Sequence, residues 1–125
     1  MNENQISYEI INASIEVHRH LGPGLLESSY KECLYYELAQ HQLNVLKEVS
    51  LPLIYKEVQL ECGYRIDLLV ENKVIIEIKS VEALNDIHLA QVLTYLKLSD
   101  RKLGLLMNFN VVRMKHGIRR VVNNL

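Results

Sequence analysis

The sequence predicts a mixed α/β or α+β domain in which a single sheet is flanked by helices. Two segments with helical periodicity open the chain, strand-like segments and a short polar loop follow, and a third helical segment precedes two further strand-like segments. With 125 residues, two separate domains would each be too small to bury a core. We therefore expect residues 1–125 to form one domain.

Two helices are predicted at the start of the chain. Apolar residues recur at near-helical spacing over residues 6–21, and the sequence Gly-Pro-Gly at 22–24 then ends the helix. A second helix is predicted over residues 25–41. Glu27 falls in its first turn, where a carboxylate favours the positive end of the helix dipole.

Strands are predicted in the middle of the chain. Residues 45–60 are rich in β-branched and alternating apolar side chains, and we expect a break there near Pro52 or Lys56. Two further strand-like runs, 64–70 and 74–78, flank a short polar loop and predict a hairpin.

The last third of the chain predicts one helix and two strands. The helix spans residues 83–99, and the strands span residues 102–109 and 118–122. Five apolar residues are expected on the buried side of this helix: Leu84, Ile87, Ala90, Leu93 and Leu96.

The predicted hairpin brings charged residues together. If its loop is centred on Asn72, Asp67 lies directly opposite Glu77, and the period of two places Lys79 on the same face as Glu77. The Cβ atoms of cross-strand partners lie about 4.5 to 5.5 Å apart, so two ionised carboxylates there destabilise a sheet unless a positive charge sits between them. Two acids and a lysine are therefore expected to converge on one face.

This arrangement suits hydrolysis of a phosphodiester with a divalent metal ion. Oxygens of Asp67 and Glu77, together with the backbone carbonyl of Ile78, can hold Mg²⁺ or Mn²⁺ and leave positions for water and a phosphate oxygen. Lys79 can orient or help deprotonate the attacking water, or stabilise developing negative charge. The spacing leaves one alternative open, an exposed salt-bridge cluster on a solvated sheet face, which contributes little stability.

Helical residues can complete the site. Gln91 can position the phosphate or the water, and His88 and Tyr95 share its face of the third helix, where Tyr95 can contact a nucleotide backbone. A plain solvated helix face is the alternative for these three residues. Glu27 and Tyr30 share a face of the second helix, and a carboxylate that only stabilises the helix start is the alternative for Glu27. Tyr30 and His88, like Tyr95, are candidate substrate-binding residues.

Charge is unevenly distributed along the chain. The formal net charge is −1, but residues 1–100 carry 8 Lys and Arg against 15 Asp and Glu, whereas residues 101–125 carry 6 Lys and Arg and no acid. The near-neutral average therefore hides an acidic body and a basic segment that suits contacts with phosphate. The candidate substrate-binding cations in this segment are Arg113, Lys115, Arg119 and Arg120.

The sequence also argues against other classes of protein. Cys33 and Cys62 lie 29 residues apart without a CxxC motif or a Cys/His cluster, so neither a zinc site nor a disulfide framework is predicted. The start of the chain lacks the features of a signal peptide, and no apolar run approaches the ~18 residues of a membrane span. We therefore expect a cytoplasmic protein that has no membrane partner.

Four segments resemble a known family. The segment HRHLGPGLLESSY (18–30) resembles the signature of the GxxExxY proteins, a bacterial and archaeal group assigned to the PD-(D/E)XK nuclease superfamily. The segments RIDLLVENKVIIEIKS (65–80), HLAQVLTYLKL (88–98) and LMNFNVVRMKHGIRRVVN (106–123) resemble that family in order and spacing. The resemblance covers nearly the whole chain, and the four motifs together are highly specific.

The resemblance implies a restriction-endonuclease-like core, in which a central mixed sheet carries the acidic residues and helices flank it. Asp67, Glu77 and Lys79 match the D…(E)xK triad of the superfamily. Glu27 matches its helical acidic residue, a candidate further metal ligand, and Gln91 matches the helical glutamine that follows the triad. The resemblance therefore implies that all five residues are catalytic.

The leading hypothesis from the sequence is a metal-dependent nuclease that acts on DNA with Mg²⁺ or Mn²⁺. One position departs from the name of the superfamily, since Ile66 stands where the name has proline, but this position touches no chemistry. The alternative is a non-catalytic nucleic-acid- or protein-binding module on the same fold. A homodimer is a further option, and an edge strand near Val111 or Val121 can serve as its interface.

Overall fold

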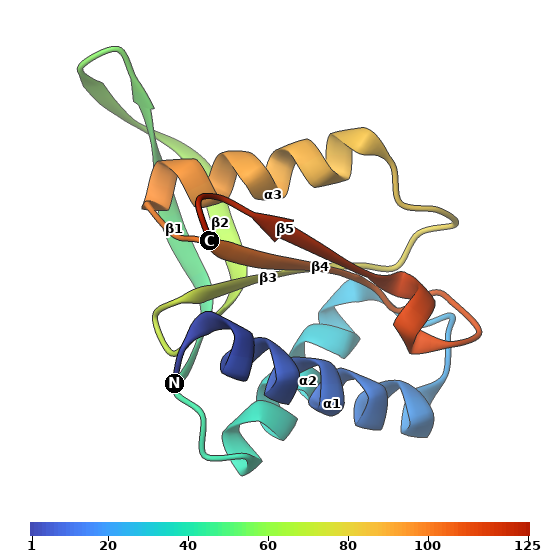
Figure 1. The fold of residues 1–125 in the computed structure, drawn as a ribbon. Coiled ribbons are helices and arrows are strands. Elements are labelled where there is room, and N and C mark those ends of the chain that lie inside the picture. Colours follow the sequence, from blue (N-terminus) through green and yellow to red (C-terminus); the bar gives the residue numbers. More distant parts are fainter.

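The sheet at the centre of the molecule separates two helical layers. The structure, a computed structural model, describes residues 1–125. Helices α1 (Glu3–Leu21) and α2 (Glu27–Gln40) cover one face of a five-stranded sheet, and α3 (Asp86–Ser99) covers the other (Figure 1). The predicted α/β class, with one sheet flanked by helices, is confirmed. No helix combines the length and the apolar character that crossing a membrane requires.

The strands follow one another across the sheet in the order of the chain. Their bounds are β1 (Val45–Tyr55), β2 (Val58–Val70), β3 (Val74–Lys79), β4 (Leu103–Asn108) and β5 (Ile118–Val122). Every neighbouring pair is antiparallel except β3 and β4, which are parallel and are joined through α3. The sheet is therefore mixed, as expected. A short 3-10 helix, η1 (Met114–Gly117), precedes β5 where no helix is predicted.

Capping side chains fix the helix starts that periodicity does not locate. Asn2 accepts a hydrogen bond from the backbone N–H of Gln5 at 2.8 Å, and the Gln5 side chain accepts one from the N–H of Asn2 at 2.9 Å. This capping box starts α1 before the predicted residue. Asn85 and His88 form an equivalent box, so α3 starts after the predicted residue. Gly22, whose φ of 68° favours glycine, ends α1 as predicted.

The apolar core is divided by the sheet into two unequal clusters. The larger one contains 18 buried residues between α1, α2 and the sheet, and the smaller one contains 8 buried residues beneath α3. In the larger cluster Tyr30 of α2 stacks on Phe109, which follows β4, with the ring centroids 4.6 Å apart. This contact holds the start of α2 against the carboxyl end of β4.

The buried face of α3 differs from the predicted one. Tyr95 and Leu96 are buried together with Val92, whereas Ile87, expected on the buried side, is 75% exposed. Apolar residues lie around much of this helix, so their spacing does not single out one face. The packing against β4 selects the face, because Gly104 carries no side chain and lets Val92 approach closely.

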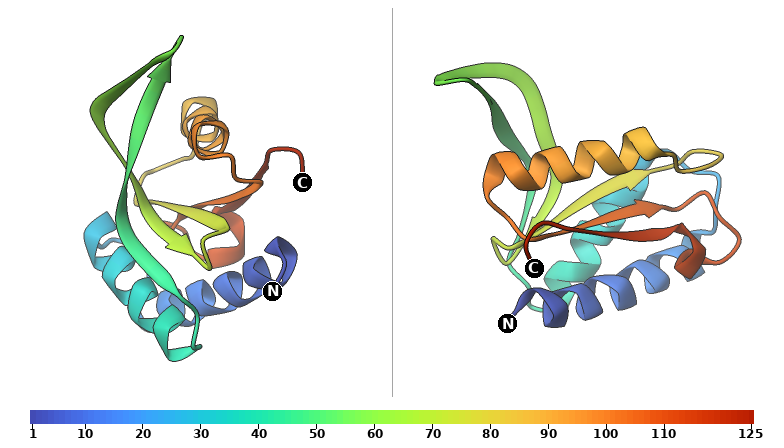
Figure 2. Two further views of the ribbon diagram at one scale, coloured as in Figure 1. Left: turned by 90° about the vertical axis from the view of Figure 1, so that its left-hand side faces the viewer. Right: turned by 45° about the horizontal axis from the view of Figure 1, so that its top comes forward.

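The strands β1 and β2 continue past the sheet as a two-stranded arm, residues 51–64, which projects on the side of α3 and away from α1 and α2 (Figures 1 and 2). The arm turns at Lys56, which has a φ of 57°, so this residue and not Pro52 marks the break between the strands. Pro52 instead lies where the strand register shifts. Most side chains of the arm are exposed, including Tyr55 and Val58 beside its turn.

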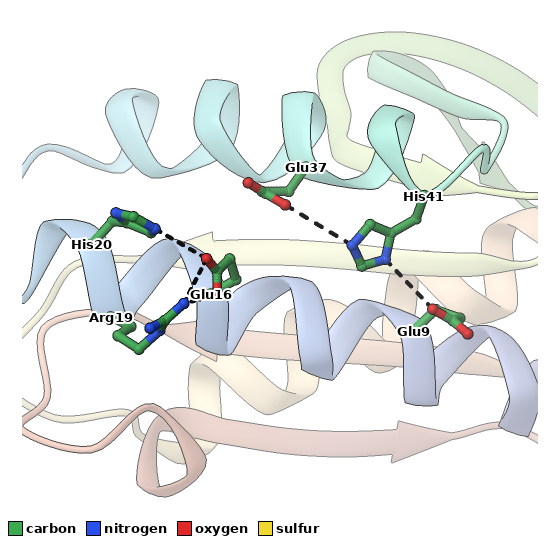
Figure 3. A network of polar contacts seen from close by, with 6 residues as sticks. All are labelled: Glu9, Glu16, Arg19, His20, Glu37 and His41. Carbon is green, nitrogen blue, oxygen red and sulfur yellow. Dashed lines mark hydrogen bonds and ion pairs between the residues drawn. The ribbon is translucent and has the colours of Figure 1, made fainter.

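A polar network joins the surfaces of α1 and α2 (Figure 3). His41 lies between the two helices, with Nδ1 3.5 Å from the Glu9 carboxylate and Nε2 3.9 Å from the Glu37 carboxylate. Within α1, Glu16 contacts both Arg19 and His20. The charges near the end of α1 are therefore partly balanced by a neighbouring acid.

Candidate active site

The ladder between β2 and β3 stops just before the acidic residues of the hairpin. Its backbone pairs are Leu68–Ile76, Leu69–Ile75 and Val70–Val74. This is the register predicted for a loop centred on Asn72. Beyond it, the backbone N–H of Asp67 donates to Oε1 of Glu77 at 3.1 Å, and the N–H of Ile78 donates to Oδ2 of Asp67 at 2.9 Å. The two carboxyl groups therefore replace backbone pairing where the strands separate.

Burial sets this acidic pair apart from a surface cluster. Glu77 is 5% exposed, and burial, together with the charge of Asp67, raises the pKa of Glu77 to about 8. Burial also raises the pKa of Asp67, although the N–H of Ile78 and the charge of Lys31 act in the opposite direction. The protonated form of Glu77 is therefore favoured at neutral pH. The solvated salt-bridge cluster that the spacing left open is excluded by this burial.

Lys79 ends β3 beside the acidic pair. Its residue partner in β4 is Asn108, and its carbonyl accepts the N–H of Phe109 at 3.0 Å. The ammonium group of Lys79 forms no ion pair. Its charge nevertheless lowers the pKa of both Asp67 and Glu77, acting against burial. Lys79 is thus an available cation next to the two carboxyl groups.

The residues at this point suit a divalent metal ion. Asp67 and Glu77 offer the hard oxygen donors that Mg²⁺ and Mn²⁺ prefer. Because Lys79 directs its carbonyl toward β4, the backbone groups of Ile78 face β2, where the ladder has ended. A cation here would also stabilise the ionised forms of both carboxyl groups. No three acidic, histidine or cysteine side chains converge on one point, so water, backbone or substrate oxygens would complete the coordination.

A cavity of about 550 Å³ opens beside Asp67 at the start of α2. Glu27 lines this cavity, and its Oε2 accepts the backbone N–H of Ser80 at 3.1 Å. Lys31 also lines it, and donates to the carboxylate of Glu48 at 2.9 Å. Sequence reasoning selects Glu27 and Asp67 but misses Lys31. The available signal is the i, i+4 spacing of Glu27 and Lys31, which places both on one helix face.

Gln91 and Tyr95 belong to the opposite side of the sheet, on α3. The side-chain amide of Gln91 donates to the hydroxyl of Tyr95 at 3.0 Å, and both residues line a cavity of about 300 Å³ between α3 and the arm. Burial, and after it the charge of Glu77, raises the pKa of Tyr95. His88 lies at the start of the same helix, where its ring accepts the N–H of Asn85.

Tyr30 lies in the core and not on the surface. It is fully buried, and its hydroxyl donates to the carbonyl of Gly22 at 2.6 Å and accepts the N–H of Leu25 at 3.1 Å. These bonds fasten the segment that joins α1 to α2. Tyr30 therefore has a structural role in place of the expected contact with substrate.

The basic C-terminal segment does not form one continuous surface. Arg120 binds Asn4 of α1, whereas the side chain of Arg119, its neighbour in β5, lies on the other face and donates to two backbone carbonyls. Arg113 and Lys115 line a cavity of about 350 Å³ beside the end of α1 and form no ion pair. These two cations follow β4, at the same end of the sheet as the acidic pair.

Comparison with known proteins gives one family. A sequence model described as the PD-(D/E)XK nuclease superfamily matches residues 4–121, a range that includes every site residue described above. No curated protein and no solved structure matches the chain significantly. Nucleases of this superfamily generally use divalent metal ions.

Proposed function

Because the chain belongs to the PD-(D/E)XK nuclease superfamily, we propose that it hydrolyses phosphodiester bonds of DNA with Mg²⁺ or Mn²⁺ as cofactor. Asp67, Glu77 and Lys79 are the residues to which we assign the reaction. Assignment to the narrower GxxExxY group is part of this proposal and is supported by the segment GLLESSY at residues 24–30.

The observation that carries the proposal is the pair of the buried Glu77 and the partly buried Asp67, with the unpaired Lys79 beside it. Burying two carboxyl groups next to each other costs stability, because each disfavours the ionised form of the other. Ion-paired surface acids carry no such cost. Acidic groups that are retained together despite this loss of stability are typical of a catalytic centre.

The residues have distinct roles in the proposed reaction. A divalent ion bound at the acidic pair would supply positive charge to the transition state and would make an attacking water more acidic. Carboxyl oxygens of Asp67 and Glu77 would hold the ion, together with the backbone carbonyl of Ile78. Lys79 donates to the attacking water, or to the phosphate oxygen that gains negative charge. Gln91 orients the phosphate or the water from α3, where its amide binds the hydroxyl of Tyr95.

The surroundings of the site support further parts of the proposal. Glu27 lines the cavity beside Asp67 and is our candidate for an additional ligand or a residue that orients water. Arg113 and Lys115, unpaired at the same end of the sheet, suit contacts with phosphates farther along the DNA. We also propose that two copies can pair through β5, which is the terminal strand of the sheet. The expected compartment is the cytoplasm.

Cleavage of DNA tests the proposal directly. Purified protein is incubated with supercoiled plasmid and with single-stranded circular DNA, in Mg²⁺, in Mn²⁺ and in EDTA. We expect cutting that requires the metal. Lys79→Ala and Asp67→Ala should each lower the rate by about a hundredfold or more, because each removes a group that acts in the transition state.

Lys73→Ala is the matched control. Lys73 lies in the loop of the same hairpin, is exposed and binds the carbonyl of Met1, so its loss should leave cutting unchanged. Absence of metal-dependent cutting, or cutting that survives both site substitutions, would contradict the proposal. Retained DNA binding without cutting would point to the non-catalytic binding module.

A further inference from the structure

We propose that the α2 side of the cavity at Asp67 is a binding subsite for a phosphate group of the nucleic acid other than the one that is cleaved, and that Lys31 is the residue that binds it. This inference rests on the proposed function, because it concerns the same substrate. It assigns a substrate contact to a residue outside the D…(E)xK motif.

Lys31 is positioned on the wall of the cavity. It lies on α2 one turn after Glu27, and both residues line the cavity of about 550 Å³ with Asp67, Ser28 and Ser80. The Lys31 side chain is only 14% exposed, so little water surrounds its charge where it lines the cavity. A cation here offsets the acidic residues of the site, which would otherwise repel a phosphate.

The structure also shows what holds Lys31 in this position. Its ammonium group donates to Glu48 of β1 at 2.9 Å. Glu48 has a φ of 52°, a left-handed conformation that is uncommon for a residue with a side chain. The β1–β2 register pairs the residues on either side of it, Lys47 and Val49, but skips Glu48 itself, which lies across from Asp67. This local distortion is a feature typical of functional sites.

The Glu48 side chain is 54% exposed, so water screens its ion pair with Lys31, and another anion can replace Glu48 as the partner of Lys31. A phosphate in the cavity would meet the Lys31 ammonium and the hydroxyls of Ser28 and Ser80. The hydroxyl of Ser80 donates to the carbonyl of Leu25 and retains its capacity to accept. A phosphodiester chain carries further phosphates next to the cleaved one, which makes it the ligand that this cavity suits.

The chain provides a matched control for Lys31. Lys47 of β1 donates to Glu32 of α2 at 2.8 Å. A second ion pair therefore joins the same two elements, with the lysine on β1 and the glutamate on α2. Lys47 is not among the residues that line the cavity, and its ammonium group lies over the ring of Tyr35. Replacing either lysine removes the same charge and a similar ion pair. Only the replacement of Lys31 removes a cation from the proposed subsite.

The test measures binding of a labelled single-stranded oligonucleotide over a range of salt concentrations, with Ca²⁺ present in place of Mg²⁺. Lys31→Met keeps the length of the side chain and is expected to weaken binding by about fivefold to tenfold. It should also reduce the slope of log affinity against log salt by about 0.7, the value for one phosphate contact. Lys31→Arg should restore both values, and Lys47→Met should leave both unchanged.

An unchanged slope in Lys31→Met, or an equal loss in Lys47→Met, would overturn the subsite, even if the wild type cuts DNA. A purely structural Lys31 would lower the melting temperature in Lys31→Met without changing the slope. If Lys31→Met does not fold, binding of the oligonucleotide by Glu48→Gln tests the subsite instead. This substitution frees Lys31 from its ion-pair partner, so it should tighten that binding. Equal or weaker binding in Glu48→Gln would then contradict the proposal. Failure of the proposed function is seen separately, as absence of cutting by the wild type.

Discussion

Glu77 makes the stability of the metal-free protein depend on pH. Its pKa is about 8 in the folded chain, whereas an unfolded glutamate titrates near its ordinary value of about 4.3. Between these values the folded state binds more protons than the unfolded state. The free energy of unfolding therefore falls as pH rises from about 4.5 to about 8. The raised pKa of Asp67 acts in the same direction.

Replacing Glu77 by glutamine is predicted to remove most of this dependence, because the amide mimics the protonated acid. We expect Glu77→Gln to match the wild type near pH 5 and to exceed it by a few kcal/mol at pH 8.5, measured by urea unfolding in EDTA. Glu61→Gln, on the exposed arm, should leave the pH profile unchanged. A wild type whose stability rises between pH 5 and 8, or equal profiles for wild type and Glu77→Gln, would contradict the raised pKa.

At the residue scale, the sequence locates the acidic pair because the hairpin loop is short and polar. Glu71 and Asn72 adopt positive φ in that loop, which fixes the register and so brings Asp67 and Glu77 together. The sequence does not reveal the use of Lys31, because an ion pair with Glu48 depends on how α2 lies over β1. The burial of Tyr30 is missed for the same reason.

Gly104 is the element-scale feature that positions α3. A Cβ atom added to it would lie 2.6 Å from a methyl group of Val92, closer than atoms can approach. We predict that Gly104→Ala lowers the free energy of unfolding by about 1 to 3 kcal/mol, because α3 must shift away from β4. Urea unfolding measures this change.

Trimming the opposing side chain provides the control for Gly104. Val92→Ala alone leaves a cavity and should also destabilise the protein. Combined with Gly104→Ala, it removes the clash, so the double variant should lose less stability than the sum of the single losses. Strict additivity would show that α3 does not approach β4 as described.

The elements themselves are largely predictable. The hairpin, β4 and β5 match their expected positions closely, since alternating apolar residues and turns identify them. The rotation of α3 is not predictable from spacing, because it depends on Gly104 of a strand that comes later in the chain. The extended arm is also unexpected, since periodicity cannot tell a strand inside the sheet from one that leaves it.

For the whole molecule, the net charge of −1 conceals two separate arrangements. The acidic pair lies between β2 and β3, with Glu77 buried and Asp67 partly buried, and the cations of the last 25 residues are dispersed over both faces of the sheet. A count of charges along the sequence predicts the uneven distribution of charge but not the dispersal of the cations. Arg119 and Arg120, for example, are neighbours in one strand, so their side chains lie on opposite faces of the sheet. Arg113 and Lys115 remain the cations of this segment that face the same end as the site.

The central claim is that the opening of the β2–β3 ladder creates a site for a divalent ion. Calorimetric titration of Mn²⁺ into the metal-free chain at pH 7, in buffers of different ionisation enthalpy, tests it most directly. We predict about one ion per chain, with net release of the Glu77 proton, and affinity at least about tenfold weaker in Asp67→Asn and Glu77→Gln. Absence of binding, or equal affinity in both variants, would contradict the account.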